Sequence, residues 1–112
     1  MQTSVLTIQQ GIDSDIYWDI TDANDQPADL TGFSAQMEVR TMMDPTSTLL
    51  QKFNPVCVNS RVLLKIDSEE TYNFTWSRGK STLVILDANG QPIDIVWSGS
   101  IKLSKIATRV EV

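Results

Sequence analysis

The chain has 112 residues, 41% of them hydrophobic and 21% charged, which fits one globular domain spanning residues 1–112. Its net charge of −5 argues against a nucleic-acid partner, and the absence of histidine removes the side chain best suited to acid–base catalysis and metal binding. The single Cys57 can form neither an internal disulfide nor a structural zinc site. We therefore expect a non-enzymatic protein without a cofactor, a metal site or a bound nucleic acid.

The N-terminal residues have no basic start, and no stretch of the chain reaches the ~20 apolar residues of a membrane span. We therefore expect no signal peptide and no membrane partner. Synthesis in the cytoplasm follows from that expectation.

Apolar residues recur with a period of two along most of the chain, which is typical of strands with one buried face. The continuously apolar residues 83–86 predict a central strand that is covered on both faces. Gly99, within the longest alternating run, predicts a bend or a bulge. The alternating runs are residues 16–20, 35–39, 62–66, 93–103 and 106–112.

One segment departs from the strand pattern. Asp67 is followed three residues later by Glu70, a capping-box spacing that predicts one or two helical turns within residues 68–75. Turn-forming residues separate the remaining runs at short, regular intervals. The fold class expected is all-β, with seven or eight short strands in an antiparallel sandwich or barrel.

A short internal repeat is the most specific feature of the sequence. Residues 22–30 and 87–95 are identical at six of nine positions, and each copy lies between two alternating runs. The Asn-Asp and Asn-Gly pairs favour the positive φ angles of tight turns. The repeat therefore predicts two similar hairpin tips.

Charge is unevenly distributed along the chain. Residues 1–39 contain seven carboxylates and no Lys or Arg, a net of −7, whereas the remainder has nine cations against seven carboxylates, a net of +2. Two interpretations follow. The carboxylates can simply keep solvent-facing strands soluble, or, if the two parts form different faces, copies can dock head to tail.

The three tryptophans, Trp18, Trp76 and Trp97, lie on or beside apolar strand faces. Packing in a sandwich core is the simpler interpretation. A glycan-binding module is the alternative of a different class, and it requires at least two exposed, coplanar aromatic rings. Cys57, between two valines, is expected to pack as a small apolar residue.

A set of turn and strand motifs extends over most of the chain. Within residues 11–40 they are Gly11-Ile12-Asp13, Tyr17-Trp18-Asp19, Asp25-Gln26-Pro27, Asp29-Leu30-Thr31-Gly32-Phe33-Ser34-Ala35 and Met37-Glu38-Val39-Arg40. Further along they are Ile66-Asp67-Ser68-Glu69-Glu70-Thr71 and Gly99-x-Ile101-x-Leu103 followed by Thr108-Arg109. With these motifs the chain resembles the immunoglobulin-like domain of tailed-bacteriophage virion proteins, such as the N-terminal domain of baseplate upper proteins and small stand-alone relatives.

The resemblance implies an immunoglobulin-like antiparallel β-sandwich in a virion structural protein. The leading expectation is an adaptor in the tail, baseplate or fibre apparatus, and the alternative is a capsid decoration protein on the head exterior. Its partners would be other virion proteins, and the chain would be homo-oligomeric in the particle.

Assembly contacts are expected on the terminal strands, because neither has a strong turn anchor and both alternate well enough to extend a sheet. Charged residues beside these strands are included. The candidate contacts are Val5, Ile8, Asp13, Asp15, Lys105, Arg109, Val110 and Val112.

Overall fold

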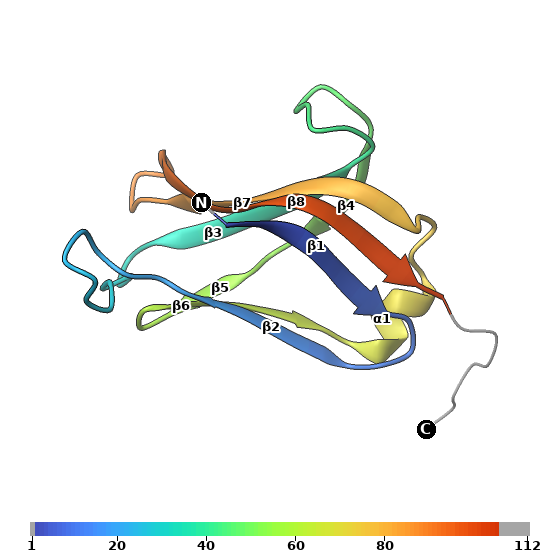
Figure 1. Ribbon diagram of the computed structural model, residues 1–112, viewed down its shortest axis with the longest axis horizontal. Helices are drawn as coiled ribbons and strands as arrows, with labels where there is room; N and C mark the ends of the chain where they lie inside the picture. The colour runs from blue at the N-terminus through green and yellow to red at the C-terminus, as the bar shows by residue number, and fades with distance from the viewer. Residues whose placement is uncertain (1, 106–112) are drawn as a thin grey trace.

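The computed structural model describes residues 2–105, with side chains from Ser4 onward. Within these residues eight strands form two sheets that pack face to face, with one short helix (Figure 1), which confirms the predicted all-β sandwich of seven or eight strands. The five-stranded sheet has the order β1 (Gln2–Gln9), β8 (Pro92–Ser104), β7 (Arg78–Leu86), β3 (Ser34–Arg40) and β4 (Leu49–Phe53). The three-stranded sheet has the order β2 (Ser14–Asp19), β6 (Arg61–Ile66) and β5 (Val56–Val58).

One strand pairing differs from the antiparallel prediction. β1 runs parallel to β8, from Gln2 opposite Trp97 to Gln9 opposite Ser104. After β1 the chain crosses to the three-stranded sheet and begins β2, so no hairpin joins β1 to its neighbour and an antiparallel direction is not imposed. The expected strand at 106–112 lies outside the described residues.

The predicted single apolar face of residues 93–103 is wrong for its first part. The pairing of β7 with β8 shifts register twice, and the successive residues Val96 and Trp97 are both buried. This irregularity turns Ile93 and Ile95 outward, where they are 51% and 45% exposed. The predicted buried face is found only from Trp97 to the end of the strand.

Gly99 lies in a regular part of the ladder, so the predicted bend or bulge is not there. A Cβ at this position would collide with the carbonyl oxygen of Ser4 on β1. Glycine is therefore needed because β1 approaches β8 closely. Close approach of another backbone is a second reason, besides a bend or a bulge, for a glycine within a strand.

β7 is central in its sheet, as predicted, but only one of its faces is fully covered. Leu83 and Ile85 are buried between the sheets, whereas Val84 and Leu86 are half-buried on the outer surface. A continuous apolar run predicts cover on both sides. Here the outer side is instead the floor of an open groove.

The core lies between the two sheets and contains all three tryptophans, as the simpler interpretation predicted. Trp18 from the three-stranded sheet meets Trp97 from the five-stranded sheet, with ring centroids 6.3 Å apart. At the helical end, Trp76 stacks on Phe74, whose ring meets Phe53 edge-on. These contacts join the two layers across their full thickness.

The predicted helical segment forms the short helix α1 (Ser68–Tyr72). Asp67 occupies the N-cap position, but its side chain makes no capping hydrogen bond. Asp13 supplies one instead, because its Oδ1 accepts a hydrogen bond from the backbone N–H of Ser68 at 2.6 Å. The buried Thr71 adds a second link, since its hydroxyl accepts a hydrogen bond from the N–H of Gly11 at 2.8 Å.

The two copies of the internal repeat form the same turn, which confirms the prediction of two similar tips. In each, the first aspartate accepts hydrogen bonds from two backbone N–H groups, two and four residues later. Both turns contain a positive φ at the fourth residue, 60° at Asp25 and 78° at Gly90. The two tips project from the same end of the sandwich (Figure 1).

Candidate assembly surfaces

Charge is divided between the two layers of the sandwich. The three-stranded layer, taken with the 20–33 segment and α1, has nine carboxylates and two cations, a net of −7. The five-stranded layer, taken with its loops through Lys105, has four carboxylates and six cations, a net of +2. The condition for head-to-tail docking, that opposite charges form different faces, is therefore met.

The edge of β1 is the first candidate surface. Among the described residues, β1 is paired only with β8, so its second edge is open. Val5 is 66% exposed on the outer face of this strand, and Thr7 is exposed beside it. An open strand edge presents backbone N–H and C=O groups that another strand can pair with.

A cluster of cations, here called the basic patch, lies on the outer face beside β1. It consists of Arg78, Lys80 and Lys102, which surround an open depression of about 380 Å³ together with Val5. Arg78 is directly opposite Lys102 in the ladder. Lys80 Nζ donates a hydrogen bond to Ser100 Oγ at 2.7 Å. Within residues 2–105, no carboxylate forms an ion pair with any of the three cations.

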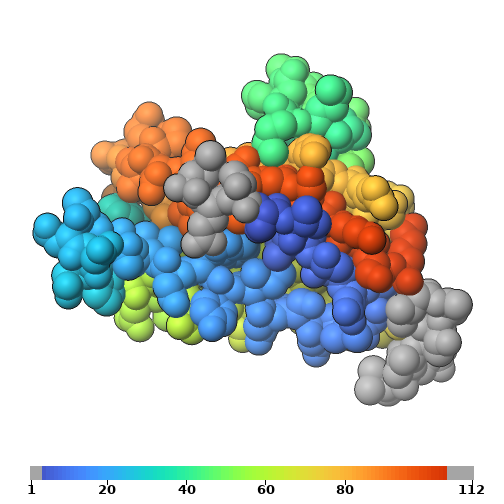
Figure 2. Space-filling view, viewed as in Figure 1, coloured from blue at the N-terminus to red at the C-terminus, as the bar shows by residue number. Residues whose placement is uncertain are grey.

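An apolar groove of about 500 Å³ crosses the same outer face. One wall is the loop at residues 41–48, which protrudes above the sheet as a knob in Figure 2. The Met43 sulfur in this loop accepts a hydrogen bond from the Thr82 hydroxyl at 3.4 Å, which holds the loop over the sheet. Val84 and Leu86 form the floor, and the second repeat turn closes the far end.

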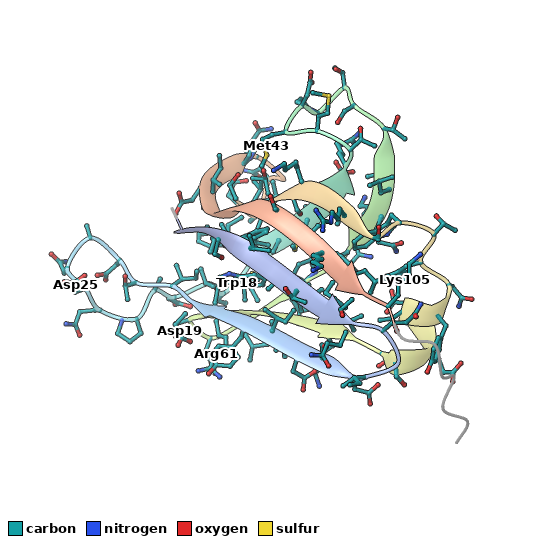
Figure 3. The ribbon with its side chains drawn as sticks, turned by 45° about the vertical axis from the view of Figure 1, so that its right-hand side comes forward. Trp18, Asp19, Asp25, Met43, Arg61 and Lys105 are labelled. Carbon is teal, nitrogen blue, oxygen red and sulfur yellow. The ribbon has the colours of Figure 1, made fainter. Side chains whose placement is uncertain are left out.

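The acidic layer is partly neutralised along its outer face. Asp19 forms an ion pair with Arg61 at 2.8 Å (Figure 3). The Arg61 guanidinium also lies 3.9 Å from the centroid of the Tyr17 ring. The hydrogen bond that Arg61 donates to the Asp19 carboxylate raises the pKa of Arg61. The 22–29 segment, here called the acidic turn, has Asp22, Asp25 and Asp29 and no cation.

The predicted contact residues fall into three groups: exposed residues, a buried residue, and residues outside the described part of the chain. Val5, Asp15 and Lys105 are exposed, and Asp13 is exposed while also capping α1. Ile8 is completely buried in the core, so its side chain cannot meet a partner and that prediction is wrong. The reason is its alternation with Val5 and Thr7 on a strand whose inner face packs between the sheets. Arg109, Val110 and Val112 lie outside the described residues.

The structure also bears on the glycan-binding alternative and on the environment of Cys57. With Trp18, Trp76 and Trp97 all buried, the exposed ring pair that a glycan platform needs is not formed by the tryptophans. Cys57 is half-buried against the core, and burial raises the pKa of its thiol, which disfavours the reactive thiolate. Between residues 2 and 105 no group of three potential metal ligands gathers, and no helix there is long and apolar enough to cross a membrane.

The basic patch and the apolar groove were not predicted from the sequence. Arg78 and Lys80 share a face by alternation, but their proximity to Lys102 depends on the β7–β8 register. The groove depends on the fold of the 41–48 loop over the sheet, for which the adjacent pair Met42 and Met43 was the only available signal. Exposed methionines are common at binding surfaces.

Comparison of the sequence with models of known families finds no match, and comparison with curated proteins finds no relative. The function is therefore inferred from the residues and surfaces of the chain, together with the resemblance described for residues 11–40.

Proposed function

We propose that this chain is a non-enzymatic structural protein of a bacteriophage virion, an adaptor in the tail, baseplate or fibre apparatus. The resemblance of residues 11–40 to an immunoglobulin-like virion domain supports the virion role. The open edge of β1 is the single observation that supports attachment by strand pairing. In this role the chain extends the sheet of a neighbouring virion protein.

β1 differs from the other three edge strands formed by residues 2–105. Natural sheets protect their edges with charges, prolines, bulges or short strands. β4 has Lys52 and a register shift against β3, β2 has Asp15 and Asp19, and β5 has only three residues. β1 has eight residues, none charged and none proline, in unbroken register with β8.

The neighbouring residues make this edge accessible. Val5 and Thr7 are exposed on one face, whereas Ile8 and Leu6 anchor the strand to the core from the other face. Because β1 is already anchored to the core, little entropy is lost in ordering it when another strand binds. The incoming strand would also cover the exposed Val5.

The proposal is tested by measuring the chain in purified particles of the phage that encodes it. The edge variant Val5→Lys/Thr7→Lys adds two charges at the open edge. The matched control Thr48→Lys/Asn54→Lys adds the same charge beside β4, at the opposite edge of the same sheet. Quantitative mass spectrometry counts the copies in each particle, and thermal unfolding checks that both variants fold.

We expect a dozen or so copies of the unmodified chain and of the control per particle, and a loss of about tenfold or more for the edge variant, because edge lysines oppose strand addition. Hundreds of copies would favour the capsid decoration role. Absence of the chain from the particles would overturn the virion proposal, and equal incorporation of both variants would overturn the role of β1.

A further inference from the structure

We infer that copies of this chain bind one another head to tail, with the acidic turn of one copy seated on the basic patch of the next. The inference concerns self-association and does not depend on the virion role. It rests on the charge, exposure and position of two surfaces, one at the end of the sandwich that carries the repeat turns and one on the outer face of the five-stranded sheet toward the other end.

The basic patch is poorly balanced within its own copy. Arg78 lies directly opposite Lys102, and Lys80 lies directly opposite Arg40. Like charges in such positions destabilise a sheet. The nearby Glu38 is already bound to Arg40 at 2.9 Å. A carboxylate from outside would therefore find three cations without an ion-pair partner among the described residues.

The acidic turn has the complementary properties. Asp22 accepts hydrogen bonds from two backbone N–H groups within the segment and so holds its shape, and Asp29 accepts one from the N–H of Thr31 just beyond it. Asp25, at the tip, is exposed, and no described residue forms a hydrogen bond or an ion pair with its side chain. The turn therefore presents a preformed carboxylate to a partner, which limits the entropy lost on binding.

The positions of the two surfaces favour binding between copies. In Figure 3, Asp25 lies at one end of the sandwich and Lys105 at the other. Lys102, three residues before Lys105 on β8, places the basic patch toward that second end. The turn projects far beyond the sheets, as Figure 2 also shows. One copy can therefore reach the next, and the contact repeats because its two halves differ, giving an open chain or a ring of copies.

The shape of the patch suits a turn rather than a flat surface. Its depression of about 380 Å³ is bordered by Val5, Ser100 and the base of the 41–48 loop at Thr41. The knob formed by that loop obstructs a broad flat partner, whereas a narrow turn can enter beside it. A contact of this size is small, so affinity should be modest and strongly dependent on salt.

The test is sedimentation velocity over a range of protein concentrations, once at about 20 mM salt and once at about 300 mM salt. At the higher salt concentration the electrostatic screening length falls well below 10 Å. Two charge-reversal variants are compared. Arg78→Glu/Lys102→Glu makes the patch acidic, and Ala23→Lys/Asn24→Lys/Asp25→Lys gives the turn a net positive charge. Lys52→Glu/Lys65→Glu is the control, with the same change in net charge as the patch variant but outside both surfaces. Melting curves confirm that each variant folds.

We expect the unmodified chain and the control to self-associate at low salt and to dissociate at high salt. Each reversed variant alone should bind at least about tenfold more weakly. An equimolar mixture of the two reversed variants should regain association, because each then offers the other an opposite charge. A monomeric unmodified chain at low salt, undiminished association of the patch variant, or failure of the mixture to associate would each overturn the inference.

Discussion

At the scale of single residues, the two repeat turns differ most at the position with positive φ. Gly90 adopts φ 78° without cost, whereas Asp25 adopts φ 60° with a side chain that disfavours this region. Asp25→Gly should therefore stabilise the protein by about 0.5–1 kcal/mol. Urea unfolding measures the difference. The reciprocal variant Gly90→Ala should lose about as much, and a destabilised Asp25→Gly would show that the aspartate has a stabilising role not seen here.

Two other aspartates predict a dependence of stability on pH. The hydroxyl and N–H of Thr31 hold the pKa of Asp29 below its usual value, and the N–H and hydroxyl of Thr46 do the same for Asp44. A lowered pKa in the folded state stabilises the protein above the ordinary value of about 3.9, and this contribution is lost as pH falls through the folded pKa.

The variant Asp29→Ala/Asp44→Ala should accordingly be less stable than the unmodified chain at neutral pH. The difference should shrink as the pH falls below the ordinary value of about 3.9 and the two carboxylates become protonated. Urea titrations at several pH values measure it. A difference that is constant from neutral to acidic pH would show that the charged forms do not contribute.

At the scale of elements, the attachment of β1 depends on Gly99. A methyl group there would collide with the Ser4 carbonyl and must displace β1 or β8. Gly99→Ala should destabilise the protein by about 1–3 kcal/mol, as overpacked sites do. Hydrogen exchange should show the loss of protection concentrated in β1. Ser100→Ala, one residue away on the outer face, should change stability by less than about 0.5 kcal/mol. Equal effects of the two variants would contradict the close approach.

The short helix α1 is held by partners from the first turn of the sandwich. Thr71 is fully buried, and its hydroxyl donates to the Ser68 carbonyl and accepts from the Gly11 N–H. Thr71→Val preserves the shape but removes both hydrogen bonds and leaves the part-buried N–H of Gly11 without this partner, at a cost of about 1–3 kcal/mol. Urea unfolding tests this, and Thr71→Ser should retain most of the hydrogen-bonding contribution. Unchanged stability of the valine variant would mean that water replaces the hydroxyl.

Local patterns predicted those elements whose burial follows alternation alone. The alternation at 35–39 and 62–66 became β3 and β6, and the matching sequences of the repeat became matching turns. Features set by distant partners could not be predicted in this way. The cap of α1 comes from Asp13, and the outward turn of Ile95 follows from a register shift against β7.

At the scale of the whole molecule, the division of charge by residue number only partly predicted the division by layer. Arg61 and Lys65 lie in the acidic layer, and Glu38 lies in the basic one. The assignment depends on which sheet each strand joins, which alternation does not specify. The contact residue Ile8 was misassigned because a terminal strand can be both an edge and part of the core.

The central claim is that the open edge of β1 pairs with a neighbouring protein in the assembled particle. Hydrogen exchange of the β1 amides, compared between the free chain and purified particles, tests it most directly. We expect protection of residues 2–9 to rise markedly in the particle, while β4, the strand at the opposite edge of the same sheet, changes little. Unchanged exchange in β1, with the chain present in the particle, would contradict the claim.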